Sequence, residues 1–146
     1  MKALALVVII LGIIFLVLLD DTPHCTVPSV HKGQNATLTC FFELNVNSTD
    51  ERHGFIVHFY GDETKAVLRC TWDSDSSLGC DVKTGYYFNN QASNTIDLII
   101  LEARENQTGT YGCQIIGRDP GTGNTCNFTL KADKSLAVRT SYQCMF

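Results

Sequence analysis

Apolar and polar side chains alternate along several short stretches of this chain, which is the pattern of β-strands with one buried face. Over residues 36–44, every second side chain is Ala, Leu, Cys or Phe, and Thr or Glu stands at most positions between them. Residues 94–101 bring Ile96, Leu98 and Ile100 to one face in the same way. These alternations predict an all-β protein.

Further strands are expected where short apolar stretches lie between loop-forming segments. They cover residues 25–30, 54–60, 66–72, 81–88, 109–116 and 126–131. The segments 45–53, 73–79 and 117–124 are rich in Asn, Ser, Asp or Gly, which are residues of turns. These segments are therefore expected to be loops between the strands.

The stretch 106–116 carries the most specific pattern. Gly109, Tyr111 and Cys113 occupy alternate positions, so in a strand they share one face. A tyrosine two residues before a cysteine resembles the tyrosine corner and second cysteine of an immunoglobulin domain. Residues 36–44 resemble the strand that holds the first cysteine, Cys40, and the length between the two cysteines is similar to that of a variable-type (V-set) domain.

This resemblance implies a V-type Greek-key β-sandwich over residues 22–132. It also implies a disulfide between Cys40 and Cys113 and a structural role for Tyr111. Two positions depart from the family. Gln107 stands where the family has an acidic residue, so the family's surface ion pair is not carried over, and residues 54–60 lack the family's tryptophan. We expect Phe55, Val57 and Phe59 to supply the apolar face instead.

The N-terminus is typical of an export signal. Met1-Lys2 precedes an apolar run over residues 3–19, and Asp20-Asp21 follows it. Residues 1–21 are therefore expected to be a cleaved signal peptide or a retained signal anchor, and the chain would contact a membrane only in the second case. Residues 133–146 are expected to form a C-terminal tail or stalk. The expected location is secreted or on the outer face of the plasma membrane.

Seven cysteines in an exported chain predict disulfides. Cys70 and Cys80 are close enough in sequence to staple a hairpin. Cys25 and Cys126 begin the first and last expected strands, which are neighbours in a V-set sandwich, so the resemblance implies that they pair. Cys144 is left over, which predicts a disulfide-linked dimer or a lone thiol; the alternative is that the chain is a fragment of a longer protein.

Four Asn-x-Ser/Thr sequons predict N-linked glycans at exposed positions. The acceptor residues are Asn35, Asn47, Asn106 and Asn127. The alternation of Asn127 with Phe128 predicts that Asn127 points away from the core.

Aromatic and arginine side chains dominate the energetics of protein interfaces, so they are the candidates for partner contacts. They are Trp72, Arg69, Tyr86, Tyr87 and Arg118. Trp72 has an alternative role in packing over a disulfide, and at most one of Tyr86 and Tyr87 is expected in the core because neighbours in a strand face opposite sides.

No catalytic motif or zinc-ligand spacing is recognised, so neither an enzyme nor a metal or cofactor site is expected. A net charge of −4 without a basic run argues against nucleic-acid binding. The resemblance to small leukocyte receptors of the natural-killer and T-cell type, and to B7-like ligands, implies an extracellular module that binds another protein. Two alternatives stay open: a virus-encoded immunoglobulin-like glycoprotein that evades immunity, and a homophilic adhesion module.

Overall fold

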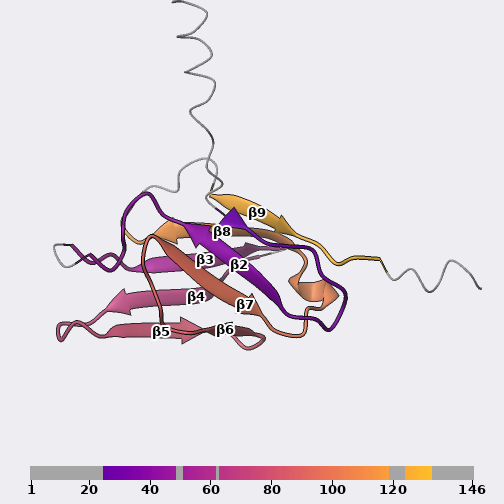
Figure 1. Cartoon of the computed structure of the whole chain (residues 1–146), viewed down its shortest axis with the longest axis horizontal. Coiled ribbons are helices and arrows are strands. Elements are labelled where there is room, and N and C mark those ends of the chain that lie inside the picture. The colour runs from indigo at the N-terminus through magenta and orange to yellow at the C-terminus, as the bar shows by residue number, and fades with distance from the viewer. Residues whose placement is uncertain (1–24, 49–50, 62, 119–123, 133–146) are drawn as a thin grey trace, which may run out of the picture.

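The computed structural model describes residues 25–48, 51–61, 63–118 and 124–132, and its regular structure is almost entirely β. One sheet has four strands, in the spatial order β1 (Cys25–Thr26), β2 (Ala36–Phe41), β7 (Thr95–Ile100) and β6 (Tyr86–Phe88). The other has five, in the order β5 (Leu78–Val82), β4 (Thr64–Trp72), β3 (Phe55–Tyr60), β8 (Gly109–Ile115) and β9 (Thr125–Phe128). Neighbouring strands in both sheets are antiparallel (Figure 1).

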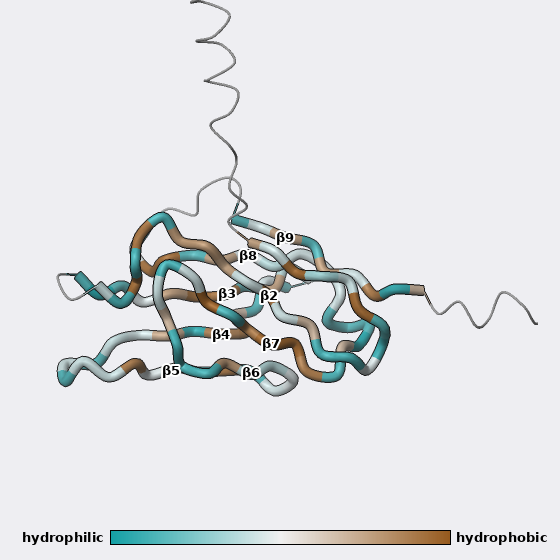
Figure 2. Tube along the Cα trace, viewed as in Figure 1, coloured by the Kyte–Doolittle hydropathy of each residue, from teal (hydrophilic) through white to brown (hydrophobic). Residues whose placement is uncertain are grey.

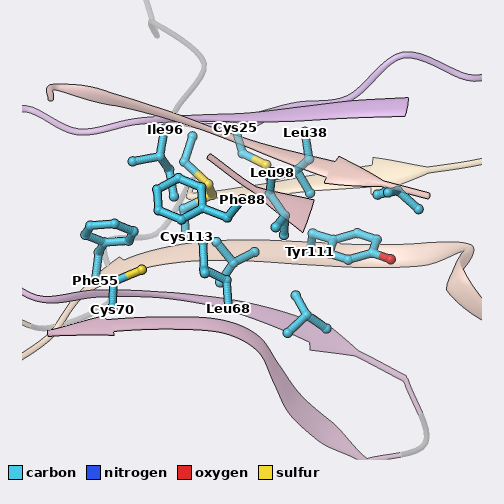
Figure 3. Close-up of a cluster of buried hydrophobic side chains, with 14 of the residues drawn as sticks. Cys25, Leu38, Phe55, Leu68, Cys70, Phe88, Ile96, Leu98, Tyr111 and Cys113 are labelled. Carbon is cyan, nitrogen blue, oxygen red and sulfur yellow. A yellow bond between two sulfur atoms is a disulfide. The ribbon is translucent and has the colours of Figure 1, made fainter. Parts of the chain in front are cut away.

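The two sheets bury their facing sides against each other, and the apolar positions of the alternating stretches form the core. Its largest fully buried side chains are Tyr111, Phe55, Phe128, Leu38, Leu68, Ile96, Leu98 and Ile100. Figure 2 shows apolar residues along β3, β4 and β7, and Figure 3 shows side chains from both sheets meeting between the ribbons. Burying each large apolar side chain stabilises the fold by about 1.5–3 kcal/mol.

Phenylalanines fill the part of the core next to β3. The ring centroid of Phe55 lies 5.9 Å from those of both Phe42 and Phe88. Val57 is fully buried, and the ring of Phe59 packs 5.0 Å from that of Tyr111. The inward face of β3 is therefore the apolar face predicted from its alternation, and it forms without a tryptophan.

Three disulfides join the strands. Cys40 of β2 is bonded to Cys113 of β8, which links the two sheets through the core. Cys25 of β1 is bonded to Cys126 of β9, which links the sheets at the edge where these strands lie. Cys70 and Cys80 are directly paired across β4 and β5 and are bonded within one sheet. These are the pairs expected from the sequence; Cys144 lies outside the described residues.

The segment 81–88 differs from its prediction as one strand. It is divided between β5 and β6, which belong to different sheets. The chain turns at Gly85, whose φ of +92° is in the left-handed region that favours glycine. The carbonyl oxygen of Gly85 accepts a hydrogen bond from the backbone N–H of Leu101, so the turn is held against the end of β7.

Candidate recognition surfaces

The outward side of the five-stranded sheet begins with the alternation of β3. Because Phe55 and Val57 point into the core, Ile56, His58 and Tyr60 point away from it. The strand register extends each of these residues into a row across the sheet. The rows are Asp81–Arg69–Ile56–Gln114, Ala66–His58–Gly112–Thr125 and Thr64–Tyr60–Thr110–Asn127. We call the part centred on Ile56, His58, Tyr60, Arg69 and Gly112 the outward β3 face.

The ring of Tyr60 lies over Gly112 on this face, and the absence of a side chain at Gly112 leaves room for it. Tyr60 is 40% exposed, and its ring stacks on that of His58 with centroids 6.0 Å apart and planes 28° from parallel. A Cβ at Gly112 would lie 2.7 Å from Cε2 of Tyr60, so any larger residue would displace the ring. The Nδ1 atom of His58 is buried without a hydrogen-bond partner among the described residues.

The β4–β5 side of the face carries charge. Arg69 and Asp81 are both exposed and lie opposite each other in the strand register. No ion pair joins them within the described structure, so both charges are available to a partner. Ile56 lies next to Arg69 but is only 8% exposed, so this side of the face presents mainly the charges of Arg69 and Asp81.

Two of the residues predicted to contact a partner lie at one end of the sandwich, beyond the first residue of β3. Trp72 ends β4 and is half-buried; its indole N–H donates to the carbonyl oxygen of His53 at 3.2 Å, and Arg52 lies over its ring at 5.3 Å. Arg118 is exposed after β8, and its carbonyl oxygen accepts a hydrogen bond from Gln114. Trp72 therefore packs against the loop before β3, which differs from the alternative expected for it, packing over a disulfide.

The adjacent tyrosines separate as the strand pattern predicts. Tyr86 packs against the core, and its hydroxyl is 2.9 Å from that of Tyr111. Tyr87 is 51% exposed on the outward side of the four-stranded sheet, beside Ile99. Of the five predicted contact residues, only Arg69 belongs to the outward β3 face. Ile56, His58 and Tyr60 were missed, although their alternation with Phe55 and Val57 already placed them opposite the core.

Tyr111 closes the turn before β8. Its ring is fully buried and its hydroxyl donates to the carbonyl oxygen of Gln107 at 2.7 Å, which is the contact implied by the tyrosine corner. Burial raises the pKa of Tyr111, and the neighbouring Tyr86 raises it further. Burial also raises the pKa of Tyr86, against the opposing effect of its hydrogen bonds to Tyr111 and Gln107.

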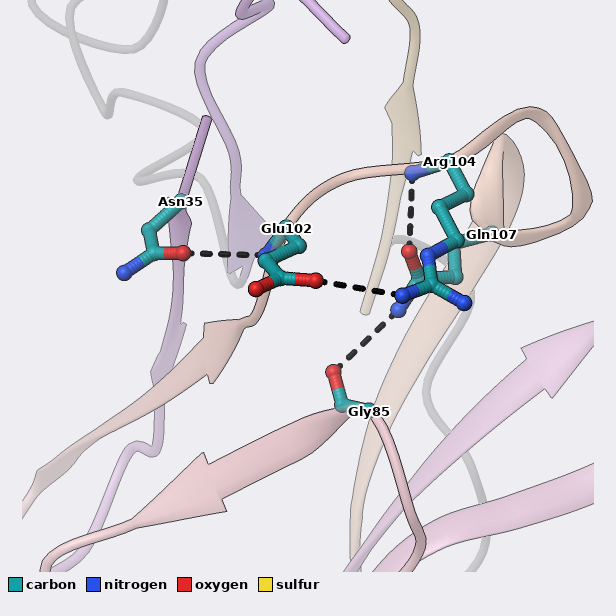
Figure 4. Close-up of polar contacts among 5 residues, drawn as sticks. All are labelled: Asn35, Gly85, Glu102, Arg104 and Gln107. Carbon is teal, nitrogen blue, oxygen red and sulfur yellow. Dashed lines mark hydrogen bonds and ion pairs between the residues drawn. The ribbon is translucent and has the colours of Figure 1, made fainter. Parts of the chain in front are cut away.

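Gln107 is buried, whereas the resemblance noted from the sequence implied a surface position. It ends a short 3-10 turn, η1 (Glu105–Gln107), and its side chain joins two loops (Figure 4). Its Oε1 accepts from the backbone N–H of Arg104 at 2.9 Å, and its Nε2 donates to the carbonyl oxygen of Gly85 at 3.2 Å. A neutral amide can serve as both acceptor and donor here, which a carboxylate cannot do.

A cleft of about 750 Å³ lies beside this network, which we call the edge cleft. It is bordered by the β3–β4 turn, the β5–β6 turn and the segment 101–107. Phe59, Val67 and Tyr86 form apolar parts of its lining. The lining also holds Lys65, Lys83 and Arg104 together with the carboxylates of Glu63 and Glu102. Its volume is within the range of ligand-binding pockets.

All four sequon asparagines are exposed. Asn35 precedes β2, and its Oδ1 accepts from the backbone N–H of Glu102 at 2.9 Å. Asn47 lies in the loop before β3, Asn106 lies in η1 and lines the edge cleft, and Asn127 lies on the outward side of β9. Each has the exposure that a glycan would need.

In the part of the chain that the structure describes, no helix has the length and apolar character to cross a membrane. Within the same residues, no three His, Cys, Asp or Glu side chains are arranged to hold a metal ion. A comparison with protein-family models finds none that matches the chain, and a comparison with curated proteins finds no matching relative.

Proposed function

We propose that this chain is an exported immunoglobulin-like domain of the V type that binds another protein through the outward β3 face. The strand orders β1-β2-β7-β6 and β5-β4-β3-β8-β9 support the fold assignment. A V-type sandwich has two extra strands in one sheet, and here β4 and β5 extend the sheet that holds β3, β8 and β9. The disulfide between β2 and β8 and the tyrosine corner beside it support the same assignment.

Export is supported by the disulfides and the N-terminal sequence. Three intrachain disulfides are typical of proteins that fold in an oxidising compartment. Residues 1–21, which lie outside the described part, have the composition of a signal peptide or signal anchor. We therefore infer a secreted or cell-surface glycoprotein and, with the resemblance to leukocyte receptors and their ligands, a setting in immune recognition.

The single observation that carries the binding proposal is the exposed ring of Tyr60, which stacks on half-buried His58 over Gly112 beside the unpaired charges of Arg69 and Asp81. Tyrosine and arginine are frequent hot-spot residues because each offers a large contact area together with hydrogen-bonding groups. Here Tyr60 is held in place before a partner arrives, which lowers the entropy lost on binding. Within the described residues, the four-stranded sheet has no exposed aromatic ring that stacks on another ring over a glycine.

The test is a binding screen of the secreted chain, displayed as a multivalent probe, against a panel of cell-surface ectodomains. For a partner found in this way, we expect Tyr60→Ala to weaken affinity by at least about tenfold, equivalent to about 1.4 kcal/mol. Tyr87→Ala is the matched control, because it removes an exposed tyrosine from the other sheet. The proposal is wrong if Tyr87→Ala weakens binding and Tyr60→Ala, correctly folded, does not.

Homophilic adhesion is the second candidate, favoured by the unpaired Arg69 and Asp81. Two copies related by a twofold axis can place Arg69 of one against Asp81 of the other, because a twofold interface uses the same patch on both copies. Sedimentation of the secreted chain tests this candidate. Arg69→Asp should abolish a dimer, and Arg69→Asp combined with Asp81→Arg should restore it; a dimer unaffected by Arg69→Asp would exclude this arrangement.

A further inference from the structure

The edge cleft differs from the outward β3 face in being concave and in having an acceptor asparagine in its lining. Phe59 and Tyr86 contribute rings, Val67 contributes a buried aliphatic side chain, and Asn106 lies in the same lining. Asn106 is exposed, so its side-chain nitrogen can carry a glycan in the folded protein. A glycan attached here would begin at the cleft.

The chemistry of the cleft fits a carbohydrate. The faces of a pyranose ring that carry only C–H groups pack on apolar and aromatic side chains, whereas its hydroxyl and acetamide groups need donors and acceptors. The charged groups around the cleft include Lys65 paired with Glu63 at 3.3 Å and Arg104 paired with Glu102 at 3.1 Å. Lys83 has no ion-pair partner among the described residues and is exposed.

Two of the other acceptor positions, Asn127 and Asn47, lie away from the edge cleft. Asn127 lies on the outward side of a strand, between Cys126 and Phe128, and does not line the edge cleft. Asn47 lies in the loop before β3 and does not line it either. A glycan at Asn127 or Asn47 would therefore extend into solvent, which is the usual arrangement.

We propose that the N-linked glycan on Asn106 folds back into the edge cleft, where its first sugars cover Phe59 and Tyr86 and bond to the charged side chains around them. The glycan then fills space between the β3–β4 turn, the β5–β6 turn and η1, and ties the three together. This inference rests on the export that is part of the proposed function, and it is independent of which protein partner the domain binds.

The experiment uses the full chain secreted from glycosylating cells. Mass spectrometry measures occupancy at each acceptor, and a glycosidase is then applied to the native protein. The Asn106 glycan should be released at least about tenfold more slowly than the Asn127 glycan, because a seated glycan is protected until the site opens. Hydrogen exchange should be at least about fivefold faster over residues 64–67 and 83–86 in Asn106→Gln than in the wild type.

Asn127→Gln is the matched control, and it should leave hydrogen exchange at those residues unchanged. If Asn106→Gln does not fold, Thr108→Ala removes the same acceptor sequon while keeping Asn106 and provides the comparison. Equal release from Asn106 and Asn127 with unchanged exchange at the cleft would overturn the inference. A bare Asn106 in a chain glycosylated elsewhere would overturn this inference alone, whereas a secreted chain bare at all four acceptors would also remove the glycoprotein part of the proposed function.

Discussion

At the scale of single residues, Tyr111 has the largest fully buried side chain in the described structure. Its ring is fully buried, its hydroxyl donates to the carbonyl oxygen of Gln107 at 2.7 Å, and the same hydroxyl lies 2.9 Å from that of Tyr86. A buried carbonyl that loses its donor is costly, because no water replaces the lost hydrogen bond. The hydroxyl of Tyr111 is therefore expected to matter separately from its ring.

Tyr111→Phe should keep the packing of the ring and lower the free energy of unfolding by about 1–3 kcal/mol, the cost of an unsatisfied buried group. Tyr86→Phe is the control. It removes a hydroxyl from the same pair but leaves the bond from Tyr111 to Gln107, so the loss should be smaller, about 1 kcal/mol. Urea unfolding of both variants measures the difference. If both variants lose the same free energy of unfolding, the hydrogen bond from Tyr111 to Gln107 does not account for the stability that the hydroxyl of Tyr111 provides.

Alkaline pH should destabilise the fold through these two tyrosines. Burial raises the pKa of both above the ordinary value of 10.0, so the folded state keeps its phenol protons after the unfolded state has lost them. Their contribution to stability is therefore complete below pH 10.0 and falls as the pH rises from there towards the raised values. A group that keeps its proton in the folded state while it is ionised in the unfolded state lowers the free energy of unfolding by at most about 1.4 kcal/mol per pH unit, and partial exposure to solvent makes the loss smaller.

Urea unfolding at a series of pH values from about 9 to 11 measures this loss, with phenolate absorbance as a second signal. The variant that combines Tyr86→Phe and Tyr111→Phe should be less stable at neutral pH but should show a flatter dependence above pH 10.0. The same steep fall in the double variant would assign the alkaline effect to other groups.

At the scale of elements, the passage from β5 to β6 moves the chain from one sheet to the other. β5 pairs only with the second half of β4, through residues 68–72, so it is a short strand at the edge of its sheet. The Cys70–Cys80 disulfide holds it there. A short edge strand gains few backbone hydrogen bonds, so a covalent link should contribute much of its stability.

Replacing both Cys70 and Cys80 with Ala should preserve the sandwich and selectively loosen β5. The bond closes a loop with a sequence separation of 10, for which the chain-entropy account gives about 3 kcal/mol. Hydrogen exchange should accelerate most in residues 78–82, and urea unfolding should report the overall loss. The control replaces Cys40 and Cys113, whose link between the sheets should be needed for folding at all. Uniform acceleration across both sheets in the Cys70/Cys80 variant would contradict this local role.

The sharp alternations were sufficient to predict β2, the inward face of β3, β7 and the position of Tyr111. The split of residues 81–88 could not be predicted in this way, because the stretch is too weakly patterned to show which sheet each half joins. Its turn depends on the left-handed backbone of Gly85 and on hydrogen bonds to distant residues such as Leu101. Those contacts exist only after the sheets have packed.

The candidate site was less predictable than the fold, because residue type is a poor guide to location. Tyr86 and Trp72 have the chemistry of contact residues, yet one packs on Tyr111 and the other on a loop. The ring of Tyr60 is positioned by Gly112, which is distant in the sequence and lies on the neighbouring strand. Such pairs follow from strand order and register, which sequence alternation alone leaves open.

At the scale of the whole molecule, the four acceptor asparagines limit where a large partner can dock. Asn127 lies in the same row as Tyr60, with Thr110 between them, and all three point outward. Adjacent strands are about 4.8 Å apart, so a glycan at Asn127 would start about 10 Å from the backbone of Tyr60. It would border the outward β3 face on the β9 side and leave the β4–β5 side, with Arg69 and Asp81, open.

Asn127→Gln should therefore speed association with the partner by several-fold while changing dissociation little, because the glycan obstructs approach but makes no contact in the bound state. Surface plasmon resonance of the fully glycosylated chain and the variant measures both rates. Asn47→Gln is the control: it removes a glycan from the loop before β3, at the end of the sandwich where Trp72 lies, and should leave association unchanged. If instead Asn47→Gln speeds association and Asn127→Gln does not, the partner approaches that end of the sandwich, and the loops there would replace the outward β3 face as the docking surface.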